Sequence, residues 1–246
     1  MEKPALLPKG LPFWFKDVER IWFAAFAHGV RQSRQDARKS RMDFLPMHDL
    51  IIATRNRQKT REFAAILGED FRVVDLSAYA ELPEVAETGR TFEDNARLKA
   101  LAISCQLAGL VLADDSGLEV DSLGGAPGVF SARYAGAAAS DEANRQKLLM
   151  ELAKQGPAAA RTGRFRCVLV LAQDGKVLVT REGWVAGEIV RQARGSGGFG
   201  YDSLFKPCGF AQTFAELPTA TKNSISHRGR AAAKLKQFFR AANLVE

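Results

Sequence analysis

The sequence predicts an α/β fold, and three observations lead to that prediction. Short apolar runs alternate with amphipathic segments from Leu50 onward, which is the pattern of strands followed by helices. Several amphipathic segments carry helix start and stop signals, such as Thr91 and Asp94 in capping-box spacing with Gly109 beyond the end. The chain has 246 residues, 46% of them hydrophobic, which suffices for one sizeable core. We therefore expect one main domain over residues 47–246.

The expected elements follow one another along that domain. Strands are predicted at residues 50–53, 71–76, 110–113, 118–120, 164–172 and 177–190, with Gly183 and Gly187 as candidate breaks in the last. Helices are predicted at residues 57–67, 91–108, 140–155 and 225–242. Residues 195–200 are too rich in glycine for either element, and we interpret them as a functional loop. Together these elements predict a mixed sheet flanked by helices.

The first 46 residues differ from the rest of the chain. They carry nine Lys and Arg against five Asp and Glu, and charged residues interrupt their apolar stretch, so no membrane span is expected. Their acidic residues also argue against a transit peptide. We interpret residues 1–46 as a basic extension that is either poorly ordered or not part of the native protein. Met47 precedes the first convincing strand, and we hypothesise that translation starts there.

The charge of the main domain points to small substrates. Of the formal net charge of +7, only +3 falls on residues 47–246, which is too balanced for a long nucleic-acid surface. A compact phosphorylated ligand fits better. The three cysteines are far apart in sequence and form no C-x-x-C pair, which excludes a zinc cluster or disulfide framework and favours a reducing cytoplasm.

The first candidate site lies where a buried strand turns into a helix, and it comprises Thr54, Arg55, Asn56, Arg57, Gln58 and Lys59. A helix N-terminus presents unpaired backbone N–H groups and a positive dipole end, to which Asn56 and Lys59 can add donors for a phosphate. The alternative is an ordinary Asn cap followed by a solvated basic turn.

The second candidate is the pair of carboxylates Asp114 and Asp115, followed by Ser116, which we place at the end of an apolar strand. Open α/β sheets bind ligands at strand ends. Adjacent buried carboxylates repel one another and require a cation or positive partners, and magnesium suits oxygen ligands. The same four-residue stretch, Asp-Asp-Ser-Gly, also favours a simple turn.

The remaining candidates lie before the second helix and near the C-terminus. Glu87 precedes that helix and could reach the same cation as Asp115, whereas Glu93 and Asp94 are better explained as helix-capping residues. A glycine-rich loop leads into four further candidates, and a last group begins the final helix. The four loop candidates are Phe199, Gly200, Tyr201 and Asp202, and the last group is Lys222, His227 and Arg228. Phe199 could stack on a base, but the His and Arg could equally be exposed helix-end residues.

Taken in order, these segments resemble the inosine triphosphate pyrophosphatase family, the Ham1/RdgB-like pyrophosphatases of non-canonical purine nucleoside triphosphates. The resemblance covers roughly residues 50–239. Residues 54–59 are similar to the family's T-x-N-x-x-K, residues 87–99 to E-T-G-x-T-F-x-E-N-A-x-x-K, and residues 113–118 to A-D-D-S-G-L. The F-G-Y-D at 199–202 and the S-H-R at 226–228 also match.

The resemblance implies an elongated, two-lobed α/β fold with a long central mixed sheet, a nucleotide cleft between the lobes, and a homodimer. It implies hydrolysis of ITP, dITP and XTP between the α and β phosphates, with one Mg²⁺ ion per subunit. Asp115 would be the general base and a metal ligand, and Glu87 a second metal ligand. Residues 54–59 with Ser116 would hold the polyphosphate. Phe199 to Asp202, Lys222, His227 and Arg228 would hold and recognise the base.

Three residues depart from the family pattern, namely Arg55 for Gly, Asp94 for Glu and Ser203 for Pro. We expect Arg55 to place a bulky cation beside the phosphates and so to alter KM. Two other functions compete with this interpretation. A Maf-like pyrophosphatase would prefer pyrimidine or methylated nucleotides, and a nucleic-acid-binding protein would use the basic extension.

Overall fold

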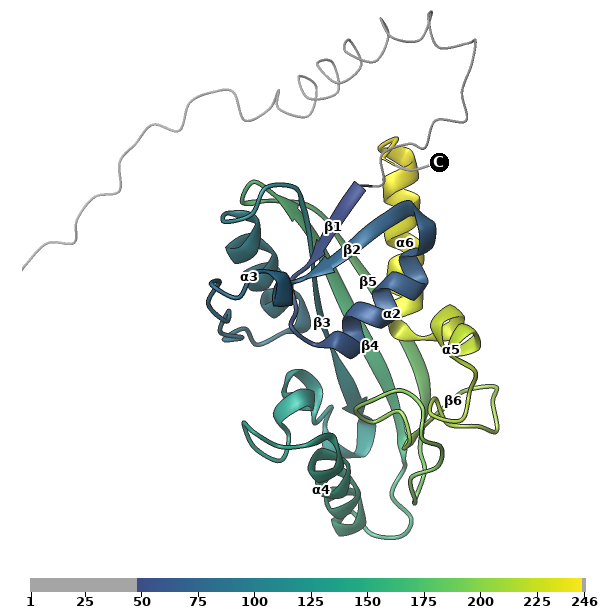
Figure 1. Ribbon diagram of the computed structural model, residues 1–246. Helices are drawn as coiled ribbons and strands as arrows, with labels where there is room; N and C mark the ends of the chain where they lie inside the picture. Colours follow the sequence, from purple (N-terminus) through teal and green to yellow (C-terminus); the bar gives the residue numbers. More distant parts are fainter. Residues whose placement is uncertain (1–47, 245–246) are drawn as a thin grey trace, which may run out of the picture. The chain divides into compact units, whose positions relative to one another are not determined.

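The computed structural model describes residues 48–244. The expectations for residues 1–46 and for Met47 therefore lie outside the described residues. The sheet consists of six strands: β1 (His48–Ile52), β2 (Phe71–Asp75), β3 (Leu110–Val120), β4 (Thr162–Gln173), β5 (Lys176–Ile189) and β6 (Phe205–Pro207). Their order across the sheet is β2-β1-β3-β4-β5-β6. β1 pairs in parallel with β2 and β3, and every later pair is antiparallel, which confirms the mixed sheet (Figure 1).

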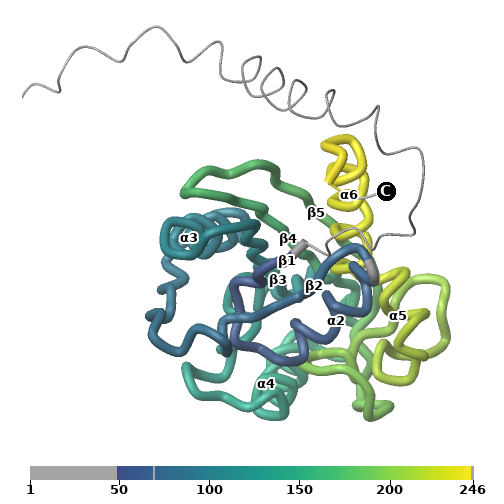
Figure 2. Tube along the Cα trace, turned by 45° about the horizontal axis from the view of Figure 1, so that its top comes forward, coloured from purple at the N-terminus to yellow at the C-terminus, as the bar shows by residue number. Residues whose placement is uncertain are grey.

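Helices cover both faces of this sheet. They are α2 (Arg57–Leu67), α3 (Phe92–Ser104), α4 (Asp141–Lys154), α5 (Thr219–Ile225) and α6 (His227–Ala241). Short 3-10 segments lie at Gly68–Asp70, Leu76–Ala78, Asp121–Leu123 and Gly128–Arg133. Figure 2 shows α3 on one side of the sheet and α2 and α6 on the other. The alternation of side chains along each strand explains this arrangement, because both faces of the central strands are apolar.

The buried side chains form three clusters. One joins β1, β3 and β4 to α2 and α6, and a second joins the opposite face of the same strands to α3. The third lies at the other end of β3, β4 and β5, where Leu148 and Leu152 of α4 pack with Phe165, Phe205 and Phe214. The long strands thus pass through two packed regions, and Asp114 to Ser116 lie on β3 between them.

The strand that carries the two aspartates is longer than expected. We predicted separate strands at 110–113 and 118–120 with the carboxylates at a strand end, and this was wrong. Every residue from Val111 to Val120 pairs with β4, so Asp114 and Asp115 lie in the middle of an 11-residue strand. The β4 ladder satisfies their backbone groups, so a strand interior tolerates them once their charges find partners.

The glycines of β5 do not break it. The strand is continuous from Lys176 to Ile189, because the glycines serve close packing and not a turn. A Cβ atom on Gly183 would lie 2.2 Å from the backbone oxygen of His227 and 2.4 Å from the nitrogen of Ala231. A side chain at this position would therefore push α6 off the sheet.

The helix predictions need smaller corrections. Residues 57–67 form α2 as expected, and the capping box of Thr91 and Asp94 begins α3. However, α3 ends at Ser104, before the predicted residue 108. The helix expected at residues 225–242 is α6, and a short helix that we did not predict, α5, precedes it. Ser226 separates the two, because its extended backbone ends α5 and its side chain caps α6. In the described part of the chain, no helix is both long and apolar enough to cross a membrane.

Candidate active site

Two neighbouring carboxylates at the middle of β3 point to opposite faces of the sheet. Asp114 lies on the face that α2 and α6 cover, and Asp115 on the face that α3 covers, because successive side chains of a strand alternate. Both are buried, with 3% and 6% of their surface exposed. Each therefore requires its own set of partners.

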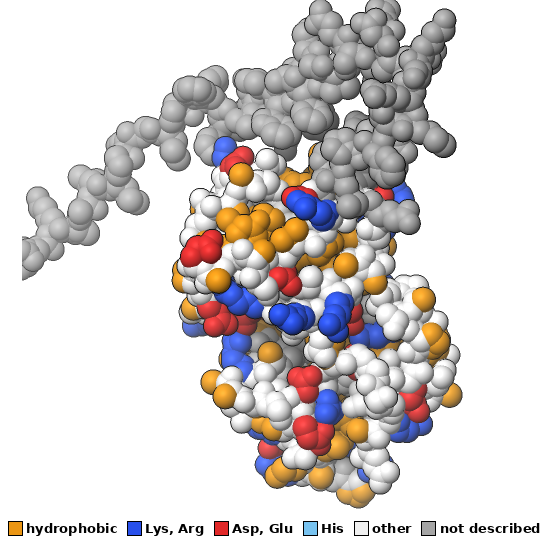
Figure 3. Space-filling view, viewed as in Figure 1, with side chains coloured by type: hydrophobic (Ala, Val, Ile, Leu, Met, Phe, Trp, Pro, Cys, Tyr) orange, Lys and Arg blue, Asp and Glu red, His pale blue; other side chains and the backbone are white. Residues whose placement is uncertain are grey.

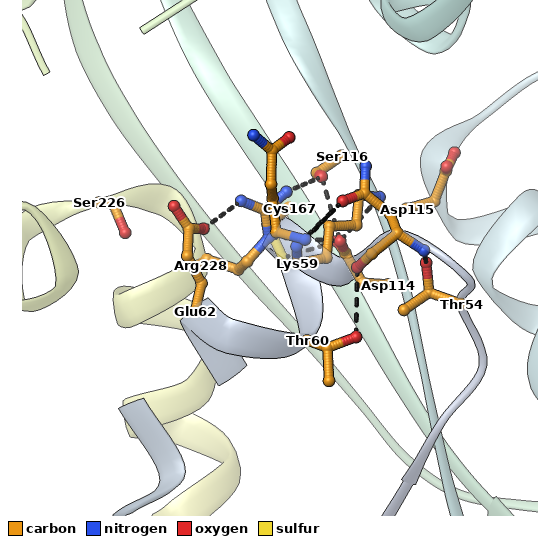
Figure 4. A network of polar contacts seen from close by, with 12 residues as sticks. Thr54, Lys59, Thr60, Glu62, Asp114, Asp115, Ser116, Cys167, Ser226 and Arg228 are labelled. Carbon is orange, nitrogen blue, oxygen red and sulfur yellow. Dashed lines mark hydrogen bonds and ion pairs between the residues drawn. The ribbon is translucent and has the colours of Figure 1, made fainter. Parts of the chain in front are cut away.

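Asp114 is surrounded by cations. Its Oδ2 lies 2.9 Å from Lys59 Nζ of α2 and 3.3 Å from Arg228 Nε of α6 (Figure 4). Arg228 also donates from Nη2 to Ser116 Oγ at 2.7 Å and from Nη1 to Glu62 Oε2 at 2.6 Å. Two helices and one strand are thus joined through alternating charges.

These cations control the ionisation of the carboxylates they contact. Burial alone would raise the pKa of Asp114, but the charges of Lys59, Arg228 and Lys99 hold that pKa far below its usual value. Burial likewise opposes the ionisation of Glu62, yet Arg228 and Lys222 keep the Glu62 pKa below normal. Both carboxylates are permanent anions at neutral pH.

Asp115 has a different environment on the α3 face. Its Oδ1 lies 3.1 Å from Lys99 Nζ, and its Oδ2 accepts from Asn95 Nδ2 at 3.2 Å. Lys99 also donates to Glu87 Oε1 at 2.7 Å and to the backbone oxygen of Asp114 at 2.8 Å. The opposite oxygen of Glu87 accepts from Arg133 at 2.8 Å. One ammonium group therefore brings together the carboxylates of Asp115 and Glu87.

The pKa of Asp115 shifts in the opposite direction to that of Asp114. Burial raises it, and the charges of Lys99 and Lys59, which lower this pKa, are opposed by those of Glu87 and Asp114, so the effect of burial prevails. For Glu87, burial is outweighed by Lys99 and Arg133, which lower its pKa. Asp115 is thus the more basic carboxylate at this site, as a general base requires.

A third group of polar side chains comes from the glycine-rich loop and from α5. Lys222 Nζ lies 2.6 Å from Asp202 Oδ2 and 2.5 Å from Glu62 Oε1, and it is 5.4 Å from the centre of the Phe199 ring. Arg228 Cζ is also 5.4 Å from that ring. The expected base-binding residues Phe199, Lys222 and Arg228 therefore lie together.

The first turn of α2 lies beside these groups. Asn56 caps the helix, since its side chain accepts from the backbone N–H groups of Gln58 and Lys59, while Arg57 and Gln58 are exposed. Thr54 Oγ1 accepts from Asn56 N at 3.1 Å. Figure 3 shows Lys and Arg side chains in a band across this face of the molecule, above a hollow. Such a surface suits an anionic ligand.

Three of the expected ligand-binding side chains are engaged elsewhere. The guanidinium of Arg55 donates to the backbone oxygen of Leu82 at 2.6 Å. Tyr201 is buried in the third core cluster, and its hydroxyl donates to the backbone oxygen of Ser131 at 2.9 Å. His227 is buried with its ring stacked on Phe165, and burial together with Arg228 lowers its pKa well below normal. Gly200 borders Phe199 in the loop.

Sequence analysis named Asp114 as one of a pair of carboxylates, but it gave no role to three other residues that complete the site: Glu62, Asn95 and Arg133. Asn95 lies inside the family motif quoted for residues 87–99, so its position in a matching segment was a usable signal. Glu62 had none, because an acid on an amphipathic helix is ordinarily solvated. Only the packing of α5 and α6 against α2 brings Lys222 and Arg228 to it.

The donors that could hold a metal ion are few. Within residues 48–244, no group of three or more His, Cys, Asp or Glu side chains is placed to hold one. Mg²⁺ commonly binds through one or two carboxylates plus water and substrate phosphates, so two donors suffice. Glu87 and Asp115 fit this description, because both already share one cation, the Lys99 ammonium.

Comparison with known proteins gives consistent results. The family model described as the Ham1 family matches residues 50–238. A dITP/XTP pyrophosphatase from Geobacter sulfurreducens is 51% identical over 192 residues, which are 77% of this chain and 96% of that protein. One from Shouchella clausii is 46% identical over 191 residues, 78% of this chain and 96% of its own. The solved structure of the Staphylococcus aureus Ham1 protein is 40% identical, with a TM-score of 0.69, and covers 79% of this chain and 99% of that one.

Both the sequence motifs and the fold are therefore shared with these proteins over nearly the whole described region. The chain belongs to the Ham1 family.

Proposed function

We propose that this protein hydrolyses dITP, ITP and XTP to the nucleoside monophosphate and pyrophosphate, and so removes these nucleotides from the precursor pool of DNA and RNA. The observation that carries the proposal is the buried Asp115, whose pKa is raised while cations surround its neighbour Asp114. The names of the relatives, dITP/XTP pyrophosphatases, give the substrate class.

Asp115 is the general base of the proposed reaction. A water that attacks the α-phosphorus must be oriented and must lose a proton, and a carboxylate of raised pKa accepts that proton readily. Asn95 and Lys99 hold the two oxygens of Asp115 from α3, so its side chain is fixed before substrate binds. This fixed orientation keeps a lone pair available to the water.

The basic residues of the site carry the charge of the polyphosphate. Lys59 and the first-turn N–H groups of α2 come from one side, and Lys99 from the other. Pyrophosphate gains charge as it leaves, and preorganised cations stabilise that charge. Ser116 Oγ accepts from Arg228 and so has its hydrogen free for a phosphate oxygen or for Asp114.

Base recognition rests on Phe199, Lys222 and Arg228. Phe199 offers a flat face for stacking, and the two cations beside it are donors for the 6-oxo group of hypoxanthine or xanthine. Adenine would present its 6-amino group to the same donors and leave both sides unpaired, which a buried site penalises strongly. This explains a preference for 6-oxopurines over adenine.

Glu87 and Asp115 would hold one Mg²⁺ ion per subunit. When bound, the ion would neutralise phosphate charge and polarise the bond that breaks. We further propose a homodimer, as the family resemblance implies, and activity in the cytoplasm, where the free thiols of Cys105, Cys167 and Cys208 would stay reduced. The molar mass in solution tests the dimer.

The function is tested by product analysis. Purified protein with Mg²⁺ receives ITP, dITP, XTP, GTP, ATP or dTTP, and products are separated as pyrophosphate or orthophosphate. We expect monophosphate and pyrophosphate from ITP, dITP and XTP, much slower turnover of ATP and GTP, and loss of turnover in Asp115→Asn. Glu151→Gln, at a half-buried position on α4 away from these groups, is the matched control.

Other outcomes would assign the protein differently. A preference for dTTP would support a Maf-like pyrophosphatase instead. Release of orthophosphate would contradict cleavage between the α and β phosphates. Salt-dependent binding of duplex DNA in the absence of any hydrolysis would favour the nucleic-acid-binding alternative.

A further inference from the structure

Two carboxylates hold the backbone on both sides of Phe199. The N–H of Phe199 donates to Asp202 Oδ2 at 2.8 Å, and the N–H of Gly200 donates to Asp141 Oδ2 at 2.7 Å. These two peptide groups flank the Cα of Phe199, so their orientation sets its φ and ψ angles. Fixing φ and ψ restricts the allowed rotamers and therefore the direction of the ring.

Asp202 belongs to the same loop as Phe199, but Asp141 comes from α4, about 60 positions earlier in the sequence. A second α4 residue acts beside it: Arg145 Nη1 donates to the backbone oxygen of Gly200 at 2.8 Å. Both backbone groups of Gly200 are thus bound by one helix. Arg145 is itself oriented by Glu142, whose Oε2 lies 2.6 Å from its Nη2.

The other hydrogen bonds of the loop lie on either side of Gly200: Gly197 N–H donates to the backbone oxygen of Ala215 at 3.0 Å and Asp202 N–H to that of Phe199 at 3.1 Å. Residues 191–198 are all exposed, and four of the six residues from 195 to 200 are glycine. Gly200 adopts φ +59°, a left-handed conformation that the preceding exposed residues do not enforce. The contacts of Gly200 with α4 therefore restrict the conformational freedom of this glycine-rich loop.

We propose that Asp141 and Arg145, which we call the α4 clamp, are positioning residues for base recognition. They hold Gly200 so that the Phe199 ring stays beside Lys222 and Arg228, to which it lies within 5.4 Å. Neither clamp residue touches substrate in this account. The proposal rests on the proposed function, because it assigns a stacking role to Phe199.

If the α4 clamp positions Phe199, its loss should change KM without changing kcat, which a purely structural role would not predict. Loosening Phe199 weakens stacking on the base and leaves Asp115 and its partners unchanged. We therefore expect Asp141→Ala to raise KM for ITP about fivefold to tenfold, the lower end of what loss of one base–aromatic stack costs. The kcat should stay within about twofold. Because stacking is shared by all purines, ITP and GTP should lose similar factors.

The experiment uses the full-length protein with Mg²⁺ and compares Asp141→Ala, Asp141→Asn and Arg145→Met. The Asn variant keeps an oxygen that accepts from Gly200 N–H, so it should restore KM for ITP to near the wild-type value. Arg145→Met keeps the negative charge of Asp141 at the start of α4, so it separates loss of the clamp from loss of helix stability. Glu151→Ala, on the same helix but away from the loop, is the control.

Amide hydrogen exchange gives a second measurement that does not depend on catalysis. In the protein without nucleotide, Asp141→Ala and Arg145→Met should speed exchange in peptides covering residues 199–202, and Glu151→Ala should not. Wild-type KM together with wild-type exchange in both clamp variants would overturn the proposal.

Phe199→Ala distinguishes failure of the clamp from failure of the proposed function. An unchanged KM for ITP in that variant would overturn the stacking role and the proposal with it. A raised KM in Phe199→Ala beside wild-type KM values in both clamp variants would overturn the clamp alone.

Discussion

The two faces of β3 give one residue type two environments. On the α2 and α6 face, Asp114 contacts Lys59 and Arg228, and both cations are buried or nearly so. On the α3 face, Asp115 contacts one ammonium and one amide, and Glu87 adds a second negative charge nearby. One position along a strand therefore separates a carboxylate that contacts two cations from one that shares a single ammonium group with a second carboxylate.

This difference explains why the pKa values of adjacent aspartates diverge. Burial raises both, but at Asp114 the cations prevail and at Asp115 they do not. Asp114 thus stays ionised and holds α2, α6 and β3 together, whereas Asp115 keeps the basicity that proton transfer requires. The β pleat, by sending neighbours to opposite faces, allows the two roles to lie side by side.

The largest expected effect is on catalysis at Asp115. Asp115→Asn keeps the shape and the hydrogen bond from Asn95 but removes the base, so kcat should fall roughly a thousandfold, about 4 kcal/mol. The midpoint of thermal unfolding should change little, since burial already disfavours the negative charge of this carboxylate. Steady-state kinetics with ITP and a thermal melt measure the two quantities. A kcat within tenfold of wild type would assign the base elsewhere.

The matching change at Asp114 should instead destabilise the protein. Asp114→Asn leaves Lys59 and Arg228 without their shared carboxylate, and removing one member of a buried charge network costs roughly 3–5 kcal/mol. Chemical denaturation, with Asp115→Asn as the matched control, measures the loss of unfolding free energy. Equal stability of the two variants would refute the division between the two faces.

Sequence analysis predicted the α/β fold, both ends of α2 and the capping box of α3, because these depend on local periodicity and side-chain caps. It also named Asp115, Glu87, Lys59 and Arg228 as site residues from short motifs, and Lys222 from its place near the last of these motifs. It broke β3 at Asp114 and Asp115, however, because Asp and Gly are rare inside strands and common in turns. The continuous ladder with β4 overrides that local preference.

The features that sequence analysis missed depend on contacts between distant segments. β6 has three residues and is a strand only because it pairs with β5. Glu62 enters the site only through Lys222 of α5 and Arg228 of α6, which are 160 and 166 positions away. Neither contact leaves a periodic signal, since both result from how α5 and α6 return across the sheet. A single sequence shows only local preferences for secondary structure and burial, and neither β6 nor Glu62 has a local preference that would indicate its role.

A third effect concerns the pH dependence of stability on the Asp114 face. His227 is buried against Phe165 with Arg228 next to it in sequence, and its pKa lies well below 6.5 in the folded protein. The unfolded chain therefore binds one more proton than the folded protein below about pH 6.5. This contribution to stability is constant above that pH and falls by up to about 1.4 kcal/mol per pH unit below it.

His227→Gln removes this titration, so the difference between its unfolding free energy and that of wild type should narrow from pH 7 to pH 5. Urea denaturation at the two pH values measures that difference. A difference that stays constant would mean that His227 keeps a normal pKa.

The smallest expected effect is at Arg55, which lies at the edge of the α3 face. Its guanidinium donates to the backbone oxygens of Leu82 and Tyr79, in the connection that leads to Glu87. The Arg55→Gly variant restores the residue usual in the family and removes these hydrogen bonds, so we expect a loss of about 0.5–1.5 kcal/mol of stability. Because the side chain faces this connection and not Lys59, KM for ITP should change by less than about threefold. Arg191→Gly, which removes an exposed arginine outside the site that also donates to a backbone oxygen, is the control for the loss of an arginine. A large fall in KM in Arg55→Gly would instead support the sequence-based expectation that Arg55 crowds the phosphates. Arg55 would then be a third cation, besides Lys99 and Arg133, on the face of β3 that carries Asp115.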